Sequence, residues 1–587
     1  MAAEMKAEAS DAKKRRYDRQ LRLWGEHGQR AMEECSICLL NGSATGTETL
    51  KNLVLPGIGA FTVVDGATVS ERDLGNNFFL DESCLGKPRA QCVTEMLKEL
   101  NEFVMGSYIA EDISEVLAAR PEFLHAFTLV IATQMEPAEL KSVAAICAAR
   151  KLPMLVVHTY GFLGYLRLDL GEHQVIETHP DHPFPDIRIL HPPATLRTYV
   201  DTHYSSLDAL DSKAFAHTPW AVLLIKAVDA WKAANGGALP TAYQAKKEVK
   251  ALVEGLRRPS VQNDANLSEA LAAINTALNV PVPSGSVAKL LSSARAKLSA
   301  LVADQRLSSL ANPSAEDAGG ALNARKSVLA FWLMAAAVER FVGAEGGGLL
   351  PMIGTIPDMT AETETYVALQ QIYAAQSASD VAAVQSHARE IAAVEGVPAD
   401  LVDLEELKRF CKNAHAVTLV SYGSLAAEWG AADAGAYSSA ADAPAPPEGL
   451  GAALEGALSN DFNKATADGA ALYVLLRAAM RFRAERSRWP GAIADAAEDV
   501  TQLRMCVAEA AREMGLPPLA SGATSPVSEE LVAEFCRWGG AEIHAVAAVM
   551  GGVASQEVIK AATHQYLPLN NTFIFNGRNG TTATLEL

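Results

Sequence analysis

The first part of the chain alternates short apolar runs with helical patterns. Residues 36–40 and 60–64 are almost wholly apolar, which is typical of buried parallel strands. Between them, residues 47–55 have a helical pattern that ends at Pro56 and Gly57, two residues that seldom continue a helix. A strand, a tight turn, a helix and a second strand in this order predict a βαβ unit of the Rossmann type.

The same pattern continues to about residue 170. Apolar runs at residues 127–132 and 154–157 predict further buried strands, separated by helical stretches. Because strands alternate with helices, we expect a parallel sheet that helices cover. The sequence therefore predicts an α/β domain over residues 1–170.

The pattern over residues 171–538 is mostly helical. Alanine-rich stretches such as residues 324–341 place their large apolar side chains on one helix face, and strand patterns almost vanish. Residues 539–587 return to the earlier style, with a helix that contains Gly551 and Gly552 followed by strand patterns. Each glycine inside a helix costs about 1 kcal/mol relative to alanine, so we expect this helix to pack closely on another element. The simplest arrangement is an α/β domain with a large, mostly α-helical insertion and a C-terminal return.

The turn after the first strand has lost two of the three glycines of a nucleotide fingerprint. That fingerprint reads Gly-x-Gly-x-x-Gly, in which the second glycine admits the phosphate and the third lets the helix pack on the strand. Here the three positions fall on Asn41, Ser43 and Gly46. Only the packing role is kept, because the Ser43 side chain would occupy space that the phosphate needs.

Charge and cysteine content narrow the possible partners and compartments. The chain has 587 residues, with 69 acidic and 50 basic residues and a net charge of −19. This excess opposes binding to nucleic acids and to anionic membranes, since both reward positive surface. The eight cysteines are spread along the chain. We expect them to be core residues, with no bound metal and a cytoplasmic or nuclear location.

Motifs at both ends of the chain resemble the adenylation fold of the E1 enzymes, which activate ubiquitin-like proteins. They are the Arg-Tyr-Asp-Arg-Gln segment at 16–20, the turn at Gly46, Val64-Asp65-Gly66 and the Gly-Gly-Val-Ala-Ser-Gln-Glu segment at 551–557. The resemblance implies a Rossmann-like E1 adenylation fold, here an inactive half. It also implies that the insertion is similar to a catalytic-cysteine domain without the cysteine.

An active member of that family holds ATP and Mg²⁺ with charged residues that this chain lacks. The ribose aspartate is kept as Asp65, whereas the asparagine, arginine, lysine and metal-aspartate positions fall on Asp73, Asn76, Arg89 and Gln134. Adenylation needs cations on the phosphates and an anionic ligand for the metal, and Asn76 and Gln134 supply neither charge. The resemblance implies that this chain binds no cofactor and that ATP and Mg²⁺ bind the partner subunit. The residues alone leave open whether Asp65 meets a ribose or caps the next turn.

The N-terminal motif gives the chain a route to catalysis without an active site. In the E1 family this segment reaches across a pseudo-twofold interface into the ATP site of the other half, so the resemblance implies that Arg19 acts there in trans. The basic residues at 13–16 have a simpler interpretation as a solvated run or a localisation signal.

A narrower resemblance connects the chain to the regulatory subunits of NEDD8-activating enzymes. It rests on His-Thr-Pro-Trp at 217–220, Ile-Pro-Asp-Met at 356–359 and Asn-Thr-Phe-Ile-Phe-Asn at 571–576. It implies a partner interface, although the helical spacing of the aromatic and apolar residues there is equally typical of a core. The interface candidates are Trp220, Ile356, Pro357, Asp358, Met359, Tyr366 and Leu369.

These resemblances imply that the chain is the non-catalytic regulatory subunit of a heterodimeric E1. The catalytic subunit would adenylate NEDD8 and capture it as a thioester, the first step of protein neddylation, before a downstream E2 receives it. Two alternatives stay open: the regulatory subunit of the SUMO-activating enzyme, which would resemble a shorter chain, and a scaffold with no role in the chemistry. A free-standing oxidoreductase is excluded, because the fingerprint glycines and a hydride-handling site are missing.

Overall fold

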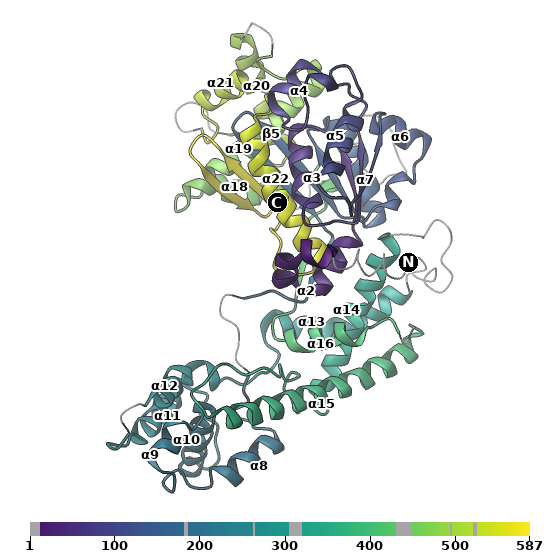
Figure 1. The fold of residues 1–587 in the computed structure, drawn as a ribbon. Helices are drawn as coiled ribbons and strands as arrows, with labels where there is room; N and C mark the ends of the chain where they lie inside the picture. The colour runs from purple at the N-terminus through teal and green to yellow at the C-terminus, as the bar shows by residue number, and fades with distance from the viewer. Residues whose placement is uncertain are drawn as a thin grey trace, which may run out of the picture. The chain divides into compact units, whose positions relative to one another are not determined.

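The chain folds into two units, each with its own core (Figure 1). The structure is a computed structural model and describes residues 12–180, 186–261, 264–303, 320–398, 400–429, 449–492, 496–519 and 525–587. Of these residues, those within Met1–His173, Pro313–Ala324 and Leu419–Leu587 form unit 1, and those within Gln174–Asn312 and Arg325–Thr418 form unit 2. Unit 1 is therefore assembled from chain segments that lie far apart in the sequence.

An eight-stranded sheet forms the centre of unit 1. The strands are β1 (Ser36–Leu40), β2 (Ala60–Val64), β3 (Met105–Ile109), β4 (Leu129–Thr133), β5 (Met154–Tyr160), β6 (Leu163–Asp169), β9 (Thr572–Asn576) and β10 (Thr581–Leu585). They run in the order β10-β9-β6-β5-β4-β1-β2-β3. Strands β1 to β5 are parallel to one another, whereas the pairs β5–β6, β6–β9 and β9–β10 are antiparallel. The predicted parallel arrangement is confirmed for β1 to β5, and so is the completion of the sheet by the C-terminus, whereas β6, β9 and β10 add antiparallel pairs that the expected parallel sheet did not include.

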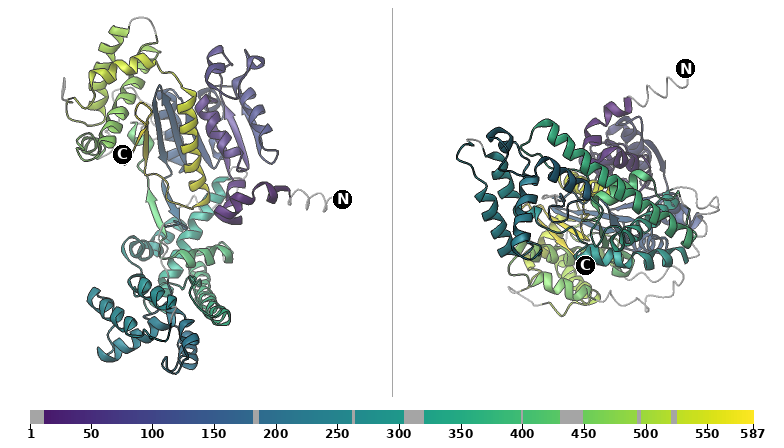
Figure 2. Two further views of the ribbon diagram at one scale, coloured as in Figure 1. Left: turned by 60° about the vertical axis from the view of Figure 1, so that its left-hand side comes forward. Right: turned by 90° about the horizontal axis from the view of Figure 1, so that it is seen from below.

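Helices cover both faces of the sheet (Figure 2), and the near-complete burial of its central strands β1, β4 and β5 explains their unbroken apolar runs. On β1, Ile37 and Leu39 join one core, and Cys38 and Leu40 join the other. The first core is covered by α2 (Asp18–Glu33), α3 (Ala44–Val54), α5 (Arg89–Glu99) and α22 (His544–Thr563). The second is covered by α6 (Ile113–Ala119), α7 (Pro137–Arg150), α17 (Leu425–Glu428), α18 (Leu450–Leu458), α19 (Lys464–Arg486), α20 (Ala496–Glu513) and α21 (Glu529–Trp538). Shorter elements are α4 (Glu71–Asn76) and the 3-10 turns η1 (Glu82–Cys84) and η2 (Phe123–Ala126).

Helix α22 packs along α3 at very short range. A Cβ atom added to Gly551 would lie 2.8 Å from the backbone and the side chain of Glu48 on α3. Any residue larger than glycine would therefore push the two helices apart. The close packing expected of this helix is confirmed at Gly551, whereas a Cβ atom on Gly552 would meet no atom within 4 Å.

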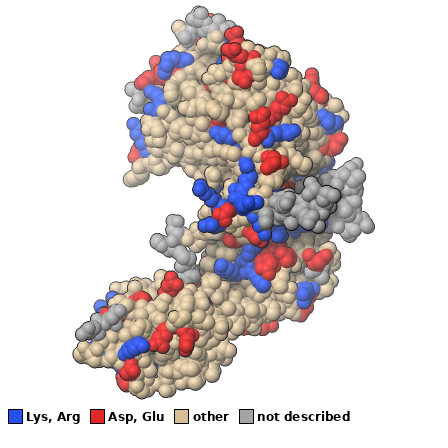
Figure 3. All heavy atoms as spheres, in the orientation of Figure 1, with Lys and Arg blue, Asp and Glu red and all other residues tan. Residues whose placement is uncertain are grey.

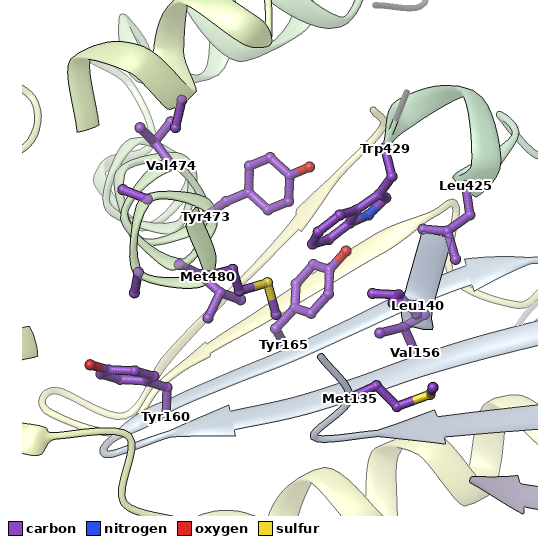
Figure 4. Close-up of a cluster of buried hydrophobic side chains, with 14 of the residues drawn as sticks. Met135, Leu140, Val156, Tyr160, Tyr165, Leu425, Trp429, Tyr473, Val474 and Met480 are labelled. Atoms are coloured by element: carbon purple, nitrogen blue, oxygen red, sulfur yellow. The ribbon is translucent and has the colours of Figure 1, made fainter. Parts of the chain in front are cut away.

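The helices after residue 418 pack on the sheet of unit 1. From the sequence we expect these helices to belong to the insertion, because a helical pattern does not reveal which core a helix joins. Their apolar side chains share one core with the sheet. Figure 4 shows Tyr165 of β6 beneath Tyr473 and Met480 of α19, with Leu425 and Trp429 beside them.

A buried ion pair attaches α17 to the sheet. The Arg167 side chain on β6 is fully buried and donates from Nε to Oε2 of Glu428 at 2.7 Å. Glu428 also accepts a hydrogen bond from the Tyr473 hydroxyl, and Nη1 of Arg477 lies 3.5 Å from Oε1. Burial alone would lower the pKa of Arg167, but the charge and hydrogen bond of Glu428 together with the nearby Tyr165 and Tyr473 outweigh burial, and the pKa is raised.

Unit 2 is mostly helical over its described residues, as the sequence predicts. Its helices are α8 (Ala194–His203), α9 (Ser212–Ala216), α10 (Trp220–Ala234), α11 (Tyr243–Gly255), α12 (Ala265–Ala277), α13 (Gly285–Ala303), α14 (Gly320–Gly343), α15 (Thr363–Glu395) and α16 (Leu404–Asn413). The strands β7 (Glu172–Val175) and β8 (Thr418–Ser421) form a separate two-stranded sheet. Helix α10 buries Leu223, Leu224 and Val228 in a core of its own unit.

Acidic and basic side chains are interspersed over the face of the molecule that Figure 3 shows. Within the described ranges, none of the helices has the length and apolar character that crossing a membrane requires.

We expect Glu428→Gln to lower the free energy of unfolding of the chain by about 3–5 kcal/mol, because it leaves the buried Arg167 charge without its counter-ion. Urea unfolding monitored by tryptophan fluorescence measures this change. The matched control is Glu530→Gln, which removes an exposed pair with Arg578 and should cost about 0–1 kcal/mol. Equal effects of the two changes would contradict a structural role for the buried pair.

Candidate functional site: the turn after the first strand

The turn between β1 and α3 is closed by its own side chains. Asn41 has a φ of +71°, the left-handed conformation that the first glycine of a fingerprint supplies. Ser43 is buried, and its hydroxyl accepts a hydrogen bond from the Gly46 amide at 3.3 Å as the N-cap of α3. At Gly46 an added Cβ atom would lie 2.8 Å from the carbonyl oxygen of Asn41 and from Oγ1 of Thr133. The packing role of the third fingerprint position is thus present in the structure.

Asp65 and Arg89 form the centre of this site. Nε of Arg89 donates to Oδ2 of Asp65 at 2.7 Å, and the same carboxylate accepts the amides of Gly42 and Ala67, each at 2.9 Å. Asp65 therefore closes the turn after β2 and the turn after β1 together. Its oxygens are already engaged by donors of the chain, which favours the capping role over ribose binding.

Arg89 uses the rest of its guanidinium on two more of the predicted positions. Nη1 donates to Asp73 at 2.9 Å and Nη2 donates to Oδ1 of Asn41 at 2.7 Å. Burial alone would raise the pKa of Asp73, but hydrogen bonds from Ser70 and the Arg89 charge lower it. The sequence predicts that Asn41, Asp65, Asp73 and Arg89 belong to one site, and in the structure they form one hydrogen-bonded cluster.

The remaining two positions also bond within the chain. Gln134, with a φ of +50°, accepts the Thr159 amide at 2.7 Å and donates to the Thr159 carbonyl at 2.9 Å. Nδ2 of Asn76 donates to the backbone carbonyl of Glu542 at 3.1 Å. Neither side chain carries a charge, and no cluster of three or more possible metal ligands occurs among the described residues. Gln134, at the position expected of the metal aspartate, therefore supplies no anionic ligand for Mg²⁺.

Glu542 is a member of this site that sequence reasoning missed. One carboxylate oxygen accepts both the backbone amide of Thr45, at 2.6 Å, and the Thr45 hydroxyl, at 2.5 Å. Thr45 is the second residue of α3, and its amide is one of those that an α-helix leaves free at its N-terminus. The only signal in the sequence is an acidic residue two positions before α22, which does not identify its distant partner.

The N-terminal motif is anchored by its aromatic residues. Tyr17 is buried, its hydroxyl accepts a hydrogen bond from Asn101 at 2.9 Å, and Trp24 is buried one heptad later on the same side of α2. Arg19, two residues after Tyr17, lies on the opposite side and is exposed. Its guanidinium makes no hydrogen bond or ion pair to any residue that the structure describes, unlike Arg22, which pairs with Asp18 at 3.0 Å.

The interface candidates divide into core and surface residues of unit 2. Trp220 and Leu369 are almost fully buried in its core, the alternative that helical spacing left open. Ile356 and Met359 pack partly against the same core. Tyr366 is half-buried and donates to the exposed Asp358 at 3.4 Å, and Pro357 beside them is half-buried.

All eight cysteines are buried and none forms a disulfide. Burial raises the pKa of Cys35 and Cys411 to about 12 and that of Cys92, Cys506 and Cys536 to about 11. The pKa values of Cys38 and Cys147 are also raised. A thioester needs an accessible thiolate, so these cysteines are unsuited to carry one.

The amino-acid sequence of the chain is similar to those of a known family. The profile of the ThiF family matches residues 17–587. The NEDD8-activating enzyme E1 regulatory subunit of Xenopus laevis is 36% identical over 586 residues, which cover 99% of this chain and 100% of the frog protein. The NEDD8-activating enzyme E1 regulatory subunit AXR1 of Arabidopsis thaliana is 36% identical over 98% of this chain and 96% of its own length. The corresponding subunit of Caenorhabditis elegans is 31% identical over 97% and 98%.

The chain belongs to the ThiF family, among the NEDD8-activating enzyme E1 regulatory subunits. Solved structures match shorter parts of it. E. coli MccB with ATP is 18% identical with a TM-score of 0.24, covering 26% of this chain and 48% of that one. The E. coli tRNA N6-threonylcarbamoyladenosine dehydratase TcdA is 20% identical with a TM-score of 0.24, covering 26% and 63%.

We expect the native chain to resist thiol alkylation. With every cysteine buried, iodoacetamide at neutral pH should label none of the eight thiols of the folded protein and all eight in denaturant. Intact-protein mass spectrometry counts the labels. Rapid labelling of one native cysteine would show an accessible thiol and would contradict this assignment.

Proposed function

We propose that this chain is the regulatory half of a heterodimeric E1 that activates NEDD8. Its partner is a catalytic E1 subunit that binds ATP and Mg²⁺, adenylates the C-terminus of NEDD8 and captures it as a thioester. Two observations together carry the proposal: the full-length similarity to regulatory subunits, and a nucleotide turn whose polar groups already bond to one another.

The chain itself binds no cofactor in this proposal. The single cation of the turn, Arg89, is committed to Asp65 and Asp73, so it is not available to phosphates. The position of the metal aspartate holds Gln134, whose amide bonds both backbone groups of Thr159. A nucleotide would have to break these bonds before it could form its own.

Arg19 is the residue through which the chain takes part in the chemistry. Its exposed position, opposite the buried Tyr17 and Trp24, supports a role at a surface outside this chain. A guanidinium placed on developing phosphate charge stabilises that charge, which is how an arginine supplied in trans accelerates phosphoryl transfer.

The remaining parts follow from the same proposal. Unit 2 helps to shape the groove that holds NEDD8, and the heterodimer passes its product to an E2. The buried free cysteines suit the reducing cytoplasm or nucleus.

A SUMO-activating regulatory subunit is the less favoured alternative, because the NEDD8 subunits match this chain from end to end. The second alternative is a scaffold without a chemical role. The effect of replacing Arg19 on the rate of adenylation distinguishes that scaffold from the proposed regulatory subunit.

We expect the isolated chain to catalyse no ATP–pyrophosphate exchange in the presence of NEDD8. Exchange should appear only when the catalytic subunit is added, because that subunit supplies the ATP site. The measurement is incorporation of labelled pyrophosphate into ATP. Exchange by the purified chain alone would refute the proposal that its own site is inactive.

We expect Arg19→Ala to slow adenylation by the reconstituted heterodimer by a factor on the order of 10³, with the two subunits still associated. Single-turnover formation of the NEDD8 adenylate measures the rate, and size-exclusion chromatography measures assembly. Arg22→Ala is the control, since Arg22 lies on the same exposed part of α2 but pairs with Asp18. An unchanged rate for Arg19→Ala would favour the scaffold alternative.

A further inference from the structure

Three backbone amides at the N-terminus of α3 donate to acceptors from the chain itself. The Gly42 amide donates to Asp65 at 2.9 Å, the Gly46 amide to the Ser43 hydroxyl at 3.3 Å, and the Thr45 amide to Glu542 at 2.6 Å. In a working nucleotide fold, a phosphate takes amides of this kind at the positive end of the helix dipole. Here carboxylates and a hydroxyl take them instead.

The Glu542 carboxylate reproduces the contacts of a phosphate oxygen. A single oxygen accepts one backbone amide and one hydroxyl, both from Thr45, and the negative charge lies against the first turn of a helix of 11 residues. Thr45 itself is fully buried, and its hydroxyl also lies 3.0 Å from that of Thr159 on β5. The carboxylate thus bonds a residue whose own hydroxyl is held against the sheet.

The backbone that carries Glu542 is fixed at this residue and at the one before it. The carbonyl of Ala541 accepts the Gly161 amide at 2.7 Å, just after β5, and the carbonyl of Glu542 accepts Nδ2 of Asn76 at 3.1 Å. The carboxylate is therefore delivered by the chain at high effective concentration and without the entropic cost of capturing a free ligand. An external anion would have to displace it.

We propose that Glu542 is the built-in anionic ligand of the former phosphate position. It deepens the proposed function, in which this site binds no nucleotide, by naming what fills the site in its place. The carboxylate neutralises the N-terminus of α3 and joins it to the segment before α22, while the backbone carbonyl of Glu542 binds Asn76 at the end of α4. Without this carboxylate, the same helix end regains affinity for an external polyanion, for which inorganic pyrophosphate is the probe.

Hydrogen exchange at the first turn of α3 tests this proposal in the full chain. We expect Glu542→Ala to accelerate amide exchange there about tenfold, because the Thr45 amide loses its acceptor and the helix end loses a favourable charge. Millimolar pyrophosphate should restore slow exchange in the variant and leave the wild-type chain unchanged. Mass spectrometry of peptides that cover residues 42–50 measures both effects.

Two further variants make the result specific. Glu542→Gln keeps an oxygen for the Thr45 amide but lacks the charge, so its exchange should lie between those of the wild type and Glu542→Ala. Glu557→Ala is the matched control on α22: this buried carboxylate accepts the Leu569 amide at 2.8 Å, away from any helix N-terminus. Exchange near Leu569 should quicken in that variant, and pyrophosphate should not reverse it.

Unchanged exchange at α3 in both Glu542 variants would overturn the proposal, as would failure of pyrophosphate to protect Glu542→Ala. Protection of the wild-type chain by pyrophosphate would also overturn it, since the position would then be open. These outcomes are distinct from failure of the proposed function, which shows itself as ATP–pyrophosphate exchange by the isolated chain.

Discussion

Helix α3 is held on two sides by contacts that leave no room for a side chain, and the α/β unit is built around it. On the sheet side, Gly46 brings the helix against the Asn41 carbonyl and Thr133; on the other side, Gly551 brings α22 against Glu48. Interiors are packed as densely as crystals, so an extra methyl group at either glycine would disturb both layers. This constraint explains why a chain without a nucleotide fingerprint keeps its third glycine.

The same packing constraint explains why the polar groups of the nucleotide site now bond to one another. A turn that must stay closed around α3 still carries backbone amides and buried carboxylates, and buried polar groups without partners are costly. Arg89 resolves this cost for Asp65 and Asp73, and Glu542 resolves it for the Thr45 amide. The polar groups of a binding site have become the internal bonds of a folded domain.

Contacts between residues close in the sequence could be predicted from the sequence alone, whereas contacts between distant residues could not. The strands at 36–40 and 60–64 were predicted at their observed bounds because both faces of the sheet are buried, and Asn41, Ser43 and Gly46 were placed by the local turn. Glu542 lies 497 residues from Thr45, and nothing in its neighbourhood identifies that contact. Likewise, helical periodicity cannot tell a buried Trp220 from an interface residue, nor assign α19 to one core or another.

The order of the strands has a consequence for folding during synthesis on the ribosome. Strand β6 has β9 as its outer neighbour, yet β9 is encoded almost at the end of the chain. The roughly 400 intervening residues take about 20–80 s to synthesise at ~5–20 residues per second. Throughout that time the nascent sheet ends in an unpaired strand, the kind of edge that templates aggregation. Unit 2, which is encoded in between, can complete its own core first, so the α/β unit is the last part of this chain to close.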